Sequence, residues 1–171
     1  MAKKIWVKAC EGIPLNGEIC WISKPVQLTK NSISIDTTIH SSIEKVWEAW
    51  TDPDIIIEWF GSDPNGKGLE AQLDVQPGGR FEVTFNDSDQ AEHTCSGIYK
   101  EVEELRKLTF SWMWKSEPGA ESFVTVLLYP QDKNTKMLFE HSNLDPASKH
   151  GYLEGWKSTF LKLERILTGK D

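Results

Sequence analysis

The sequence has few cysteines, no long apolar run and no stretch rich in basic residues, and each absence excludes a class of protein. The three cysteines, Cys10, Cys20 and Cys95, are odd in number and have no C-x-x-C spacing, which argues against a zinc site and a disulfide framework. No apolar run approaches the roughly 18 residues that cross a bilayer, and Lys8 and Glu11 interrupt the apolar stretch that a secretory signal needs. We therefore expect a cytoplasmic protein with free thiols, with a Cys10–Cys20 bridge in an N-terminal hairpin as the alternative.

Basic residues are also outnumbered, because 19 Lys and Arg stand against 26 Asp and Glu, for a formal net charge of −7. Proteins that bind nucleic acid usually carry a basic stripe that neutralises phosphates, and none is visible here. Neither nucleic acid nor an anionic membrane is therefore an expected partner. His40 and His93 have no partner at a metal-ligand spacing, so we predict no metal site, and no motif indicates a cofactor.

What the sequence does contain is large aromatic side chains: eight Trp, seven Phe and three Tyr in 171 residues. Three of the tryptophans fall in one short span, VWEAWTDPDIIIEWFG, residues 46–61. Each such ring buries about 150–250 Å² of surface. Either these rings pack against one another as a core, or they form the wall of a cavity.

The pattern of apolar residues predicts one domain with both strands and helices. Residues 32–39 alternate as a half-buried strand does. Ser41 and Glu44 form a capping-box signature for a helix whose apolar residues share one face. Asp52 and Pro53 then begin a second short helix that ends at Gly61.

The remainder of the chain reads as an antiparallel meander followed by one long helix. Strands are predicted at residues 69–75, 80–85, 93–102, 107–114, 122–130 and 136–142, with turns between them. The helix is predicted from about Pro146 to Leu167, where apolar residues recur at steps of three or four. Residues 1–30 hold two more strand-like runs, which form a hairpin or an arm.

Several strings resemble one known family when they are taken in chain order. They are KVWEAWTDPDIIIEWFG, LDVQPGGRFEV, SGIYKEV, LTFSWMW, VTVLLYP, EHSNL and GYLEGWKSTFLKLERIL. Together they are similar to the activator-of-heat-shock-protein-ATPase homologue family, within the START-like superfamily (SRPBCC, birch-pollen-allergen-like). The resemblance implies an α+β helix-grip fold over residues 31–171. In that fold a curved antiparallel sheet of six to seven strands wraps around a long C-terminal helix, and two short helices follow the first strand.

The resemblance has two departures that limit what it implies. Residues 1–30 have no counterpart in the family pattern, so they are treated as an N-terminal extension. The chain also lacks the large additional N-terminal domain of the eukaryotic co-chaperone, so the family name implies little about chaperone contact. The family has no shared catalytic residues, and none is predicted here.

The helix-grip fold often encloses an apolar cavity between its sheet and its long helix, which matches the general character of small-molecule sites. The residues predicted to line such a cavity are Trp50, Trp59, Phe60, Phe81, Phe85, Phe110, Trp112, His141, Tyr152, Trp156 and Phe160. His141 lies on the inward face of its strand, where it either orients a ligand or acts as a base, or is a hydrogen-bonded core histidine.

Three functions follow from these observations. The leading one is binding of a small hydrophobic or amphipathic molecule without catalysis. The second is an enzyme of the polyketide-cyclase or hydrolase type that uses the same cavity, with His141 or Tyr152 transferring a proton. The third is a chaperone-interacting or stress-related protein that uses its surface, and a homodimer is compatible with all three.

Overall fold

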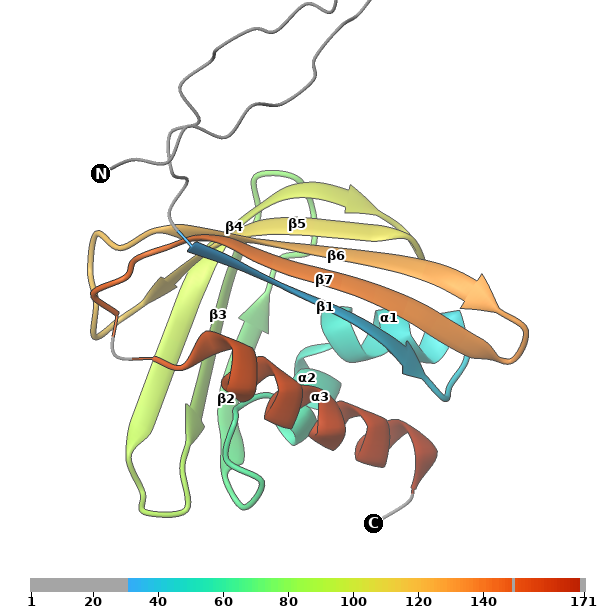
Figure 1. Ribbon diagram of the computed structural model, residues 1–171, viewed down its shortest axis with the longest axis horizontal. Helices are drawn as coiled ribbons and strands as arrows, with labels where there is room; N and C mark the ends of the chain where they lie inside the picture. The colour runs from blue at the N-terminus through green and yellow to red at the C-terminus, as the bar shows by residue number, and fades with distance from the viewer. Residues whose placement is uncertain (1–30, 149, 170–171) are drawn as a thin grey trace, which may run out of the picture.

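The computed structural model describes residues 31–148 and 150–169, in which seven strands form one antiparallel sheet accompanied by three helices (Figure 1). In chain order the elements are β1 (Asn31–Ile39), α1 (Ile43–Thr51), α2 (Pro53–Trp59), β2 (Lys67–Leu73), β3 (Arg80–Asn86), β4 (Glu92–Glu103), β5 (Lys107–Trp114), β6 (Ser122–Gln131), β7 (Asn134–Leu144) and α3 (Tyr152–Thr168). The strand order in the sheet is β1-β7-β6-β5-β4-β3-β2, so the first strand pairs with the last and the others form a meander. The N-terminal extension and the Cys10–Cys20 alternative fall outside the described residues.

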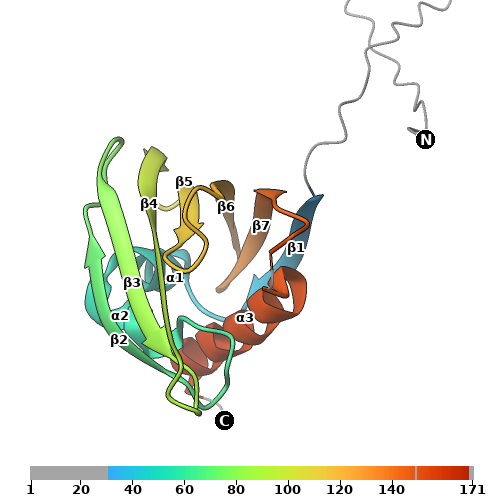
Figure 2. The same cartoon turned by 90° about the vertical axis from the view of Figure 1, so that its left-hand side faces the viewer.

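The sheet curves around α3, and the two short helices lie on the same side of the sheet as α3 (Figure 2). Strands β3, β6 and β7 alternate buried with less buried residues, so the sheet turns one apolar face inward. On α3 the inward face carries Trp156, Phe160 and Leu163, which follow one another at steps of four and three. This architecture confirms the predicted α+β helix-grip fold.

The first short helix begins one residue later than its capping signature predicted. Ser42 is the N-cap, and its hydroxyl oxygen accepts a hydrogen bond from the Lys45 amide at 3.4 Å. Ser41 instead uses its carbonyl oxygen, which accepts a hydrogen bond from the Thr135 hydroxyl at 2.9 Å. The prediction that Ser41 is the N-cap was therefore wrong, because Ser41 is hydrogen-bonded to Thr135 of β7 and the neighbouring Ser42 caps the helix.

The second short helix begins as predicted. The Asp52 carboxylate accepts a hydrogen bond from the Asp54 amide at 2.8 Å, and Pro53 occupies the first helical position. The indole N–H of Trp59 donates to the carbonyl of Ala49 at 3.0 Å, which fastens α2 to α1. An added Cβ at Gly68 would lie 2.1 Å from the carbonyl oxygen of Ile57, so this glycine lets α2 pack closely on β2.

The long helix begins at Tyr152 rather than near Pro146, where the sequence predicted it. The Ser148 amide donates to the Asp145 carbonyl at 3.0 Å, so the chain makes a turn there before it enters the helix. His150 consequently lies outside the helix, beside the end of the sheet.

Among the described residues, none of the helices combines the length and apolar character that crossing a bilayer requires.

Candidate functional site

The centre of the molecule is filled by aromatic side chains in mutual contact. The ring centroids of Trp50 and Trp59 lie 4.9 Å apart, and those of Phe139 and Trp156 lie 4.5 Å apart. A gap lined in part by Trp50 and Phe110 measures about 10 Å³. That volume is close to the smallest that can hold one water molecule. This part of the aromatic cluster is a packed core.

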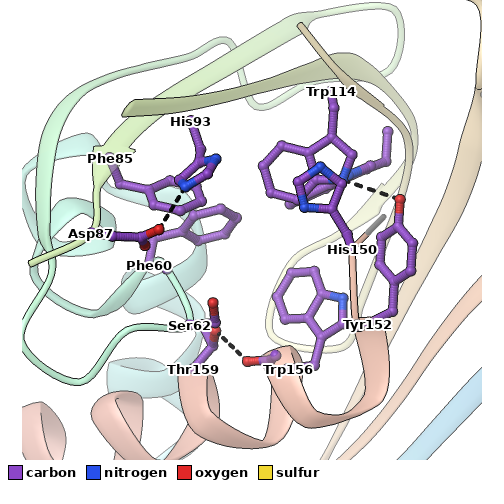
Figure 3. Close-up of a pocket in the computed structure, with 14 residues that line it drawn as sticks. Phe60, Ser62, Phe85, Asp87, His93, Trp114, His150, Tyr152, Trp156 and Thr159 are labelled. Carbon is purple, nitrogen blue, oxygen red and sulfur yellow. Dashed lines mark hydrogen bonds and ion pairs between the residues drawn. The ribbon is translucent and has the colours of Figure 1, made fainter. Parts of the chain in front are cut away.

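A larger pocket lies toward one end of the sheet, between β3, β4 and β5 on one side and the beginning of α3 on the other (Figure 3). It has a volume of about 210 Å³ and opens to solvent on one side. Its lining is mainly aromatic, with a few polar groups. The lining residues are Phe60, Gly61, Ser62, Phe85, Asp87, His93, Trp112, Trp114, His150, Gly151, Tyr152, Gly155, Trp156 and Thr159.

The residues predicted to contact a ligand divide into two groups. One group lines the pocket: Phe60, Phe85, Trp112, Tyr152 and Trp156. The other group is buried away from it: Trp50, Trp59, Phe81, Phe110, His141 and Phe160. The pocket therefore lies to one side of the aromatic cluster rather than in its middle.

His141 is completely buried and both of its ring nitrogens have partners. The indole N–H of Trp156 donates to His141 Nδ1 at 3.0 Å, and Nε2 lies 2.7 Å from the Ser122 hydroxyl oxygen. Because an indole can only donate, Nδ1 is the acceptor and Nε2 carries the proton. Burial lowers the pKa of His141 to about 3, so the ring is neutral at neutral pH. This is the geometry of a hydrogen-bonded core histidine.

One wall of the pocket comes from the hairpin of β3 and β4. The register places Phe85 opposite His93, and Asp87 follows two residues after Phe85 on the same side of the chain. The Asp87 carboxylate lies 2.7 Å from His93 Nε2. Because a carboxylate only accepts, Nε2 carries a proton, and in the neutral ring the other nitrogen is an acceptor that faces the pocket (Figure 3).

The loop that carries Asp87 is held in place by Asp63. One oxygen of the Asp63 carboxylate accepts hydrogen bonds from the Ser88 amide at 2.8 Å and the Ser88 hydroxyl at 2.7 Å. Its other oxygen accepts from the Asn65 amide at 2.8 Å. The amide of Ser88 contributes most to lowering the pKa of Asp63 to about 2. The loop that places Asp87 next to His93 is therefore itself fixed by hydrogen bonds to Asp63.

The opposite wall is a stack of aromatic rings from the end of β5 and from the segment that leads into α3. The His150 imidazole lies on the Trp114 indole, with ring centroids 4.2 Å apart and an angle of 18° between planes. The Trp114 N–H donates to the Tyr152 hydroxyl oxygen at 3.1 Å, and the Ser148 hydroxyl oxygen lies 3.4 Å from that same oxygen. Ser148 also contacts both carboxylate oxygens of Glu117 at 2.9 Å. Burial lowers the pKa of His150 and raises that of Tyr152.

The third side of the pocket is the loop after α2, which is fastened to α3. The Ser158 hydroxyl donates to the Ser62 carbonyl at 2.6 Å. The Lys162 ammonium donates to the carbonyls of Gly61 at 3.2 Å and Asp63 at 3.1 Å. Burial lowers the pKa of Lys162. Gly61 has a φ of +110°, which favours glycine where the chain leaves α2.

Nine of the fourteen lining residues were not among the predicted contacts, and four of these nine carry large or ionisable side chains: Asp87, His93, Trp114 and His150. The hairpin register was the available signal for the first two, because diagonal neighbours on one face of a two-stranded ribbon can touch. His150 had no such signal, since its place depends on where α3 begins. Within the described residues, no group of three or more His, Cys, Asp or Glu side chains is arranged to hold a metal ion.

A model of one protein family matches residues 40–168, which include every wall of the pocket. The family is described as activator of Hsp90 ATPase homolog 1-like protein. This chain belongs to that family. The match confirms the resemblance drawn from the sequence motifs, and it covers the helix-grip elements from α1 to the end of α3.

Solved structures of bacterial proteins have the same fold as this family member. A protein from Nitrosomonas europaea superposes with a TM-score of 0.70 at 20% identity, over 81% of this chain and 95% of its own. The AHSA1-like protein from Aeromonas hydrophila gives 0.69 at 24% identity, over 81% and 93%. CalU16 from Micromonospora echinospora gives 0.59 at 27% identity, over 80% and 76%. No curated protein sequence matches the chain.

Proposed function

We propose that this protein binds a small, neutral and largely apolar molecule in the pocket between β3–β5 and the beginning of α3. The observation that carries the proposal is an aromatic-lined space of about 210 Å³ that opens to solvent beside a core with almost no free volume. Small-molecule sites are typically concave and apolar, with a few fixed polar groups, and this pocket has that character.

The size of the pocket restricts the ligand to a compact molecule. An apolar cavity of about 150 Å³ can hold one benzene ring. A space of about 210 Å³ therefore suits one substituted ring or a small bicyclic ring system. Aromatic walls favour a flat ligand, because offset and edge-on contacts between rings add to the burial of apolar surface.

The charges around the pocket favour a neutral ligand over an anion such as a fatty acid. Its lining includes Asp87 but, among the described residues, no Lys or Arg. The nearby Lys162 ammonium already donates to two backbone carbonyls. An anionic ligand would lose its hydration here without gaining a cationic partner, which is costly.

The test uses tetralin, an apolar bicyclic hydrocarbon, with tryptophan fluorescence as the signal because Trp112, Trp114 and Trp156 line the pocket. We expect saturable quenching and a rise in stability of about 2.7 kcal/mol at a hundred times the dissociation constant. A Cβ added at Gly155 would lie 3.6 Å from the Ser62 side chain, so Gly155→Leu directs extra volume at the pocket and should weaken binding. Lys157→Ala, on the solvent side of α3, is the matched control and should leave binding unchanged.

Absence of saturable binding by tetralin to the wild-type protein would overturn the proposal. Equal binding by wild type and Gly155→Leu would place the ligand elsewhere.

The buried free thiol of Cys95 suits a reducing compartment, which supports a cytoplasmic location for this function.

An enzyme that uses His141 or Tyr152 for proton transfer has less support. His141 lies behind the pocket, and both of its ring nitrogens have hydrogen-bond partners. The Tyr152 hydroxyl oxygen accepts a hydrogen bond from the Trp114 N–H and lies 3.4 Å from the Ser148 hydroxyl oxygen. Neither group presents a free proton-transfer atom to the space where a ligand would lie.

A further inference from the structure

We propose that His93, oriented by Asp87, removes a proton from an enolisable ketone bound in the pocket, while His150 on the opposite wall hydrogen-bonds the carbonyl oxygen. The inference rests on the proposed binding function, and adds to it a reaction class, keto–enol tautomerisation, and a substrate class, a compact aryl or bicyclic ketone.

His93 has the arrangement that a general base needs. The Asp87 carboxylate accepts a hydrogen bond from its Nε2–H at 2.7 Å, and in the neutral ring the second nitrogen has a lone pair directed at the pocket (Figure 3). Among the described residues, no side chain or backbone group is hydrogen-bonded to that nitrogen. A carboxylate behind an imidazole fixes the tautomer and stabilises the imidazolium that forms when the ring accepts a proton.

His150 supplies the complementary group. Its ring centroid lies 6.2 Å from that of His93, close enough for one small polar unit of a ligand to contact both rings. The two imidazoles stand on opposite walls, one from β4 and one just before α3 (Figure 3). Burial lowers the pKa of His150, which favours the neutral ring. The Glu117 carboxylate lies 3.8 Å from His150 Nε2, which is too far for a hydrogen bond, so the one N–H of the neutral ring can be directed at a ligand. A neutral imidazole can stabilise the negative charge that develops on a carbonyl oxygen.

The proposed step conserves atoms and electrons without a co-reactant. The C–H bond next to the carbonyl breaks, and its proton goes to the free nitrogen of His93. The electron pair of that bond becomes the C=C bond of the enolate, and the carbonyl π pair moves to oxygen, where His150 donates its hydrogen bond. Return of the proton from His93 to oxygen gives the enol, and return to carbon gives the ketone.

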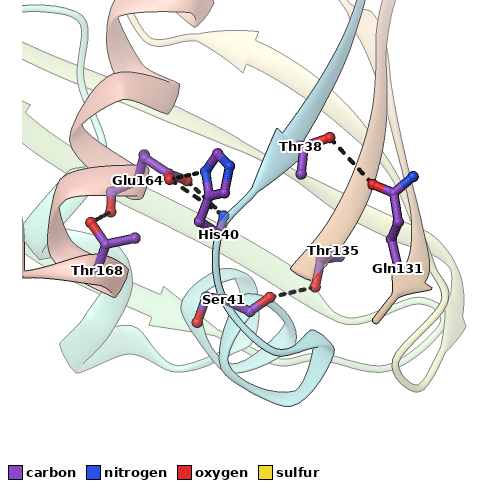
Figure 4. A network of polar contacts seen from close by, with 7 residues as sticks. All are labelled: Thr38, His40, Ser41, Gln131, Thr135, Glu164 and Thr168. Carbon is purple, nitrogen blue, oxygen red and sulfur yellow. Dashed lines mark hydrogen bonds and ion pairs between the residues drawn. The ribbon is translucent and has the colours of Figure 1, made fainter. Parts of the chain in front are cut away.

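The molecule also contains an internal comparison for this pair. His40 lies with its Nδ1 2.5 Å from a carboxylate oxygen of Glu164, but on an exposed surface between β1 and the last turns of α3 (Figure 4). It is the same kind of pair, and it does not line the pocket. If acceleration of the reaction requires that the histidine line the pocket, the pair of Asp87 and His93 accelerates it and the pair of Glu164 and His40 does not.

The experiment measures deuterium incorporation at carbon 1 of 2-tetralone by NMR in deuterated buffer, with tetralin binding measured in parallel. We expect the wild-type protein to accelerate exchange in a saturable way. His93→Gln should lower that acceleration by at least about 100-fold, the usual contribution of a general base. Asp87→Asn should lower it by at least about tenfold through the wrong tautomer. Both variants should still bind tetralin.

His150→Phe keeps an aromatic ring on Trp114 but removes the N–H donor, so it should slow exchange while tetralin still binds. His40→Gln should leave exchange unchanged. Wild-type protein that binds tetralin without accelerating exchange would overturn the inference and leave the binding function standing. An equal loss in His40→Gln and His93→Gln would also overturn it, because ordinary imidazole catalysis would then explain the exchange. Failure of the wild type to bind tetralin would overturn the binding function itself.

Discussion

His141 shows how one buried polar residue depends on a chain of hydrogen bonds. Trp156 donates to its Nδ1, its Nε2–H points at the Ser122 hydroxyl, and that hydroxyl donates to the Trp112 carbonyl at 3.3 Å. Every donor in this series of hydrogen bonds has an acceptor, so the hydrogen bonds of the buried imidazole are satisfied only when the ring is neutral. A second proton would have to go on Nδ1, where it would face the N–H of Trp156.

The first prediction is that His141 makes the protein sensitive to acid. Its pKa is lowered to about 3 in the folded protein, while an unfolded chain has the ordinary value of 6.5. Between these two pKa values the unfolded state therefore binds more protons than the folded state. The contribution of neutral, buried His141 to the free energy of unfolding is fully present above pH 6.5 and is lost as the pH falls toward 3. The slope is about 1.4 kcal/mol per pH unit. Urea unfolding should show a smaller loss between pH 6.5 and 4 for His141→Gln than for wild type.

The control for this prediction is Lys157→Ala on the solvent side of α3, which removes no imidazole. We expect Lys157→Ala to follow the wild-type pH dependence in this range. Identical pH profiles for wild type and His141→Gln would show that the buried imidazole does not titrate as proposed.

The second prediction separates packing from hydrogen bonding at Trp156. Trp156→Ala should cost about 3–5 kcal/mol, because it removes a buried large aromatic from between α3 and the sheet. Trp156→Phe keeps most of the ring but leaves His141 Nδ1 without its donor, for a cost of about 1–3 kcal/mol. Denaturant unfolding measures both. A loss below about 1 kcal/mol for the alanine variant would contradict the packing of α3 against the sheet.

At the scale of elements, α3 both completes the core and forms part of the pocket. Its buried face packs on the sheet, while Ser158 and Lys162 hold the loop after α2. Gly155 lies on this helix where it faces the loop, and it is an unusual residue for a helix interior because glycine lowers helix stability by about 1 kcal/mol relative to alanine.

The third prediction uses this glycine. A methyl group at Gly155 would meet the Ser62 side chain at 3.6 Å, an ordinary contact distance, so Gly155→Ala fits the backbone. It should raise the free energy of unfolding by about 0.5–1 kcal/mol through helix propensity, and narrow the pocket at the same time. Thermal or urea unfolding tests the first effect. Destabilisation would mean that the loop and α3 are packed too tightly to accept one methyl group.

Much of the element pattern could be predicted from the sequence because it depends on local periodicity. The alternation in β1, β3, β6 and β7, the cap at Asp52 and the apolar face of α3 all follow from spacing along the chain. The two errors, Ser41 as a cap and Pro146 as a helix start, both occur where a tertiary contact or a turn competes with helix formation.

The pocket was harder to predict because its walls come from distant segments. Asp87 meets His93 only through the β3–β4 register, and His150 reaches Trp114 only because α3 begins late. Spacing identified aromatic residues that point inward, but could not distinguish those that pack in the centre from those that border an open space. That distinction depends on how the elements pack together.

At the scale of the whole molecule, the seven strands of the described sheet all come from residues 31–144. The family match begins at residue 40, and β1 begins at Asn31 and pairs with β7 along its length. Within the described residues β1 is an edge strand, because it has β7 on one side only. Edge strands present unpaired backbone groups that another segment or another copy can cover.

The last prediction concerns the N-terminal extension, which we expect to cover the edge of the sheet or contact a second subunit. Deletion of residues 1–28 should leave a folded domain, because the seven strands and α3 supply the core. It should also lower either stability or the fraction of dimer, since the edge of β1 would lose its cover. Circular dichroism, urea unfolding and light scattering measure these three properties. Complete failure to fold would show that the extension belongs to the core, and unchanged stability and mass would show that it covers nothing.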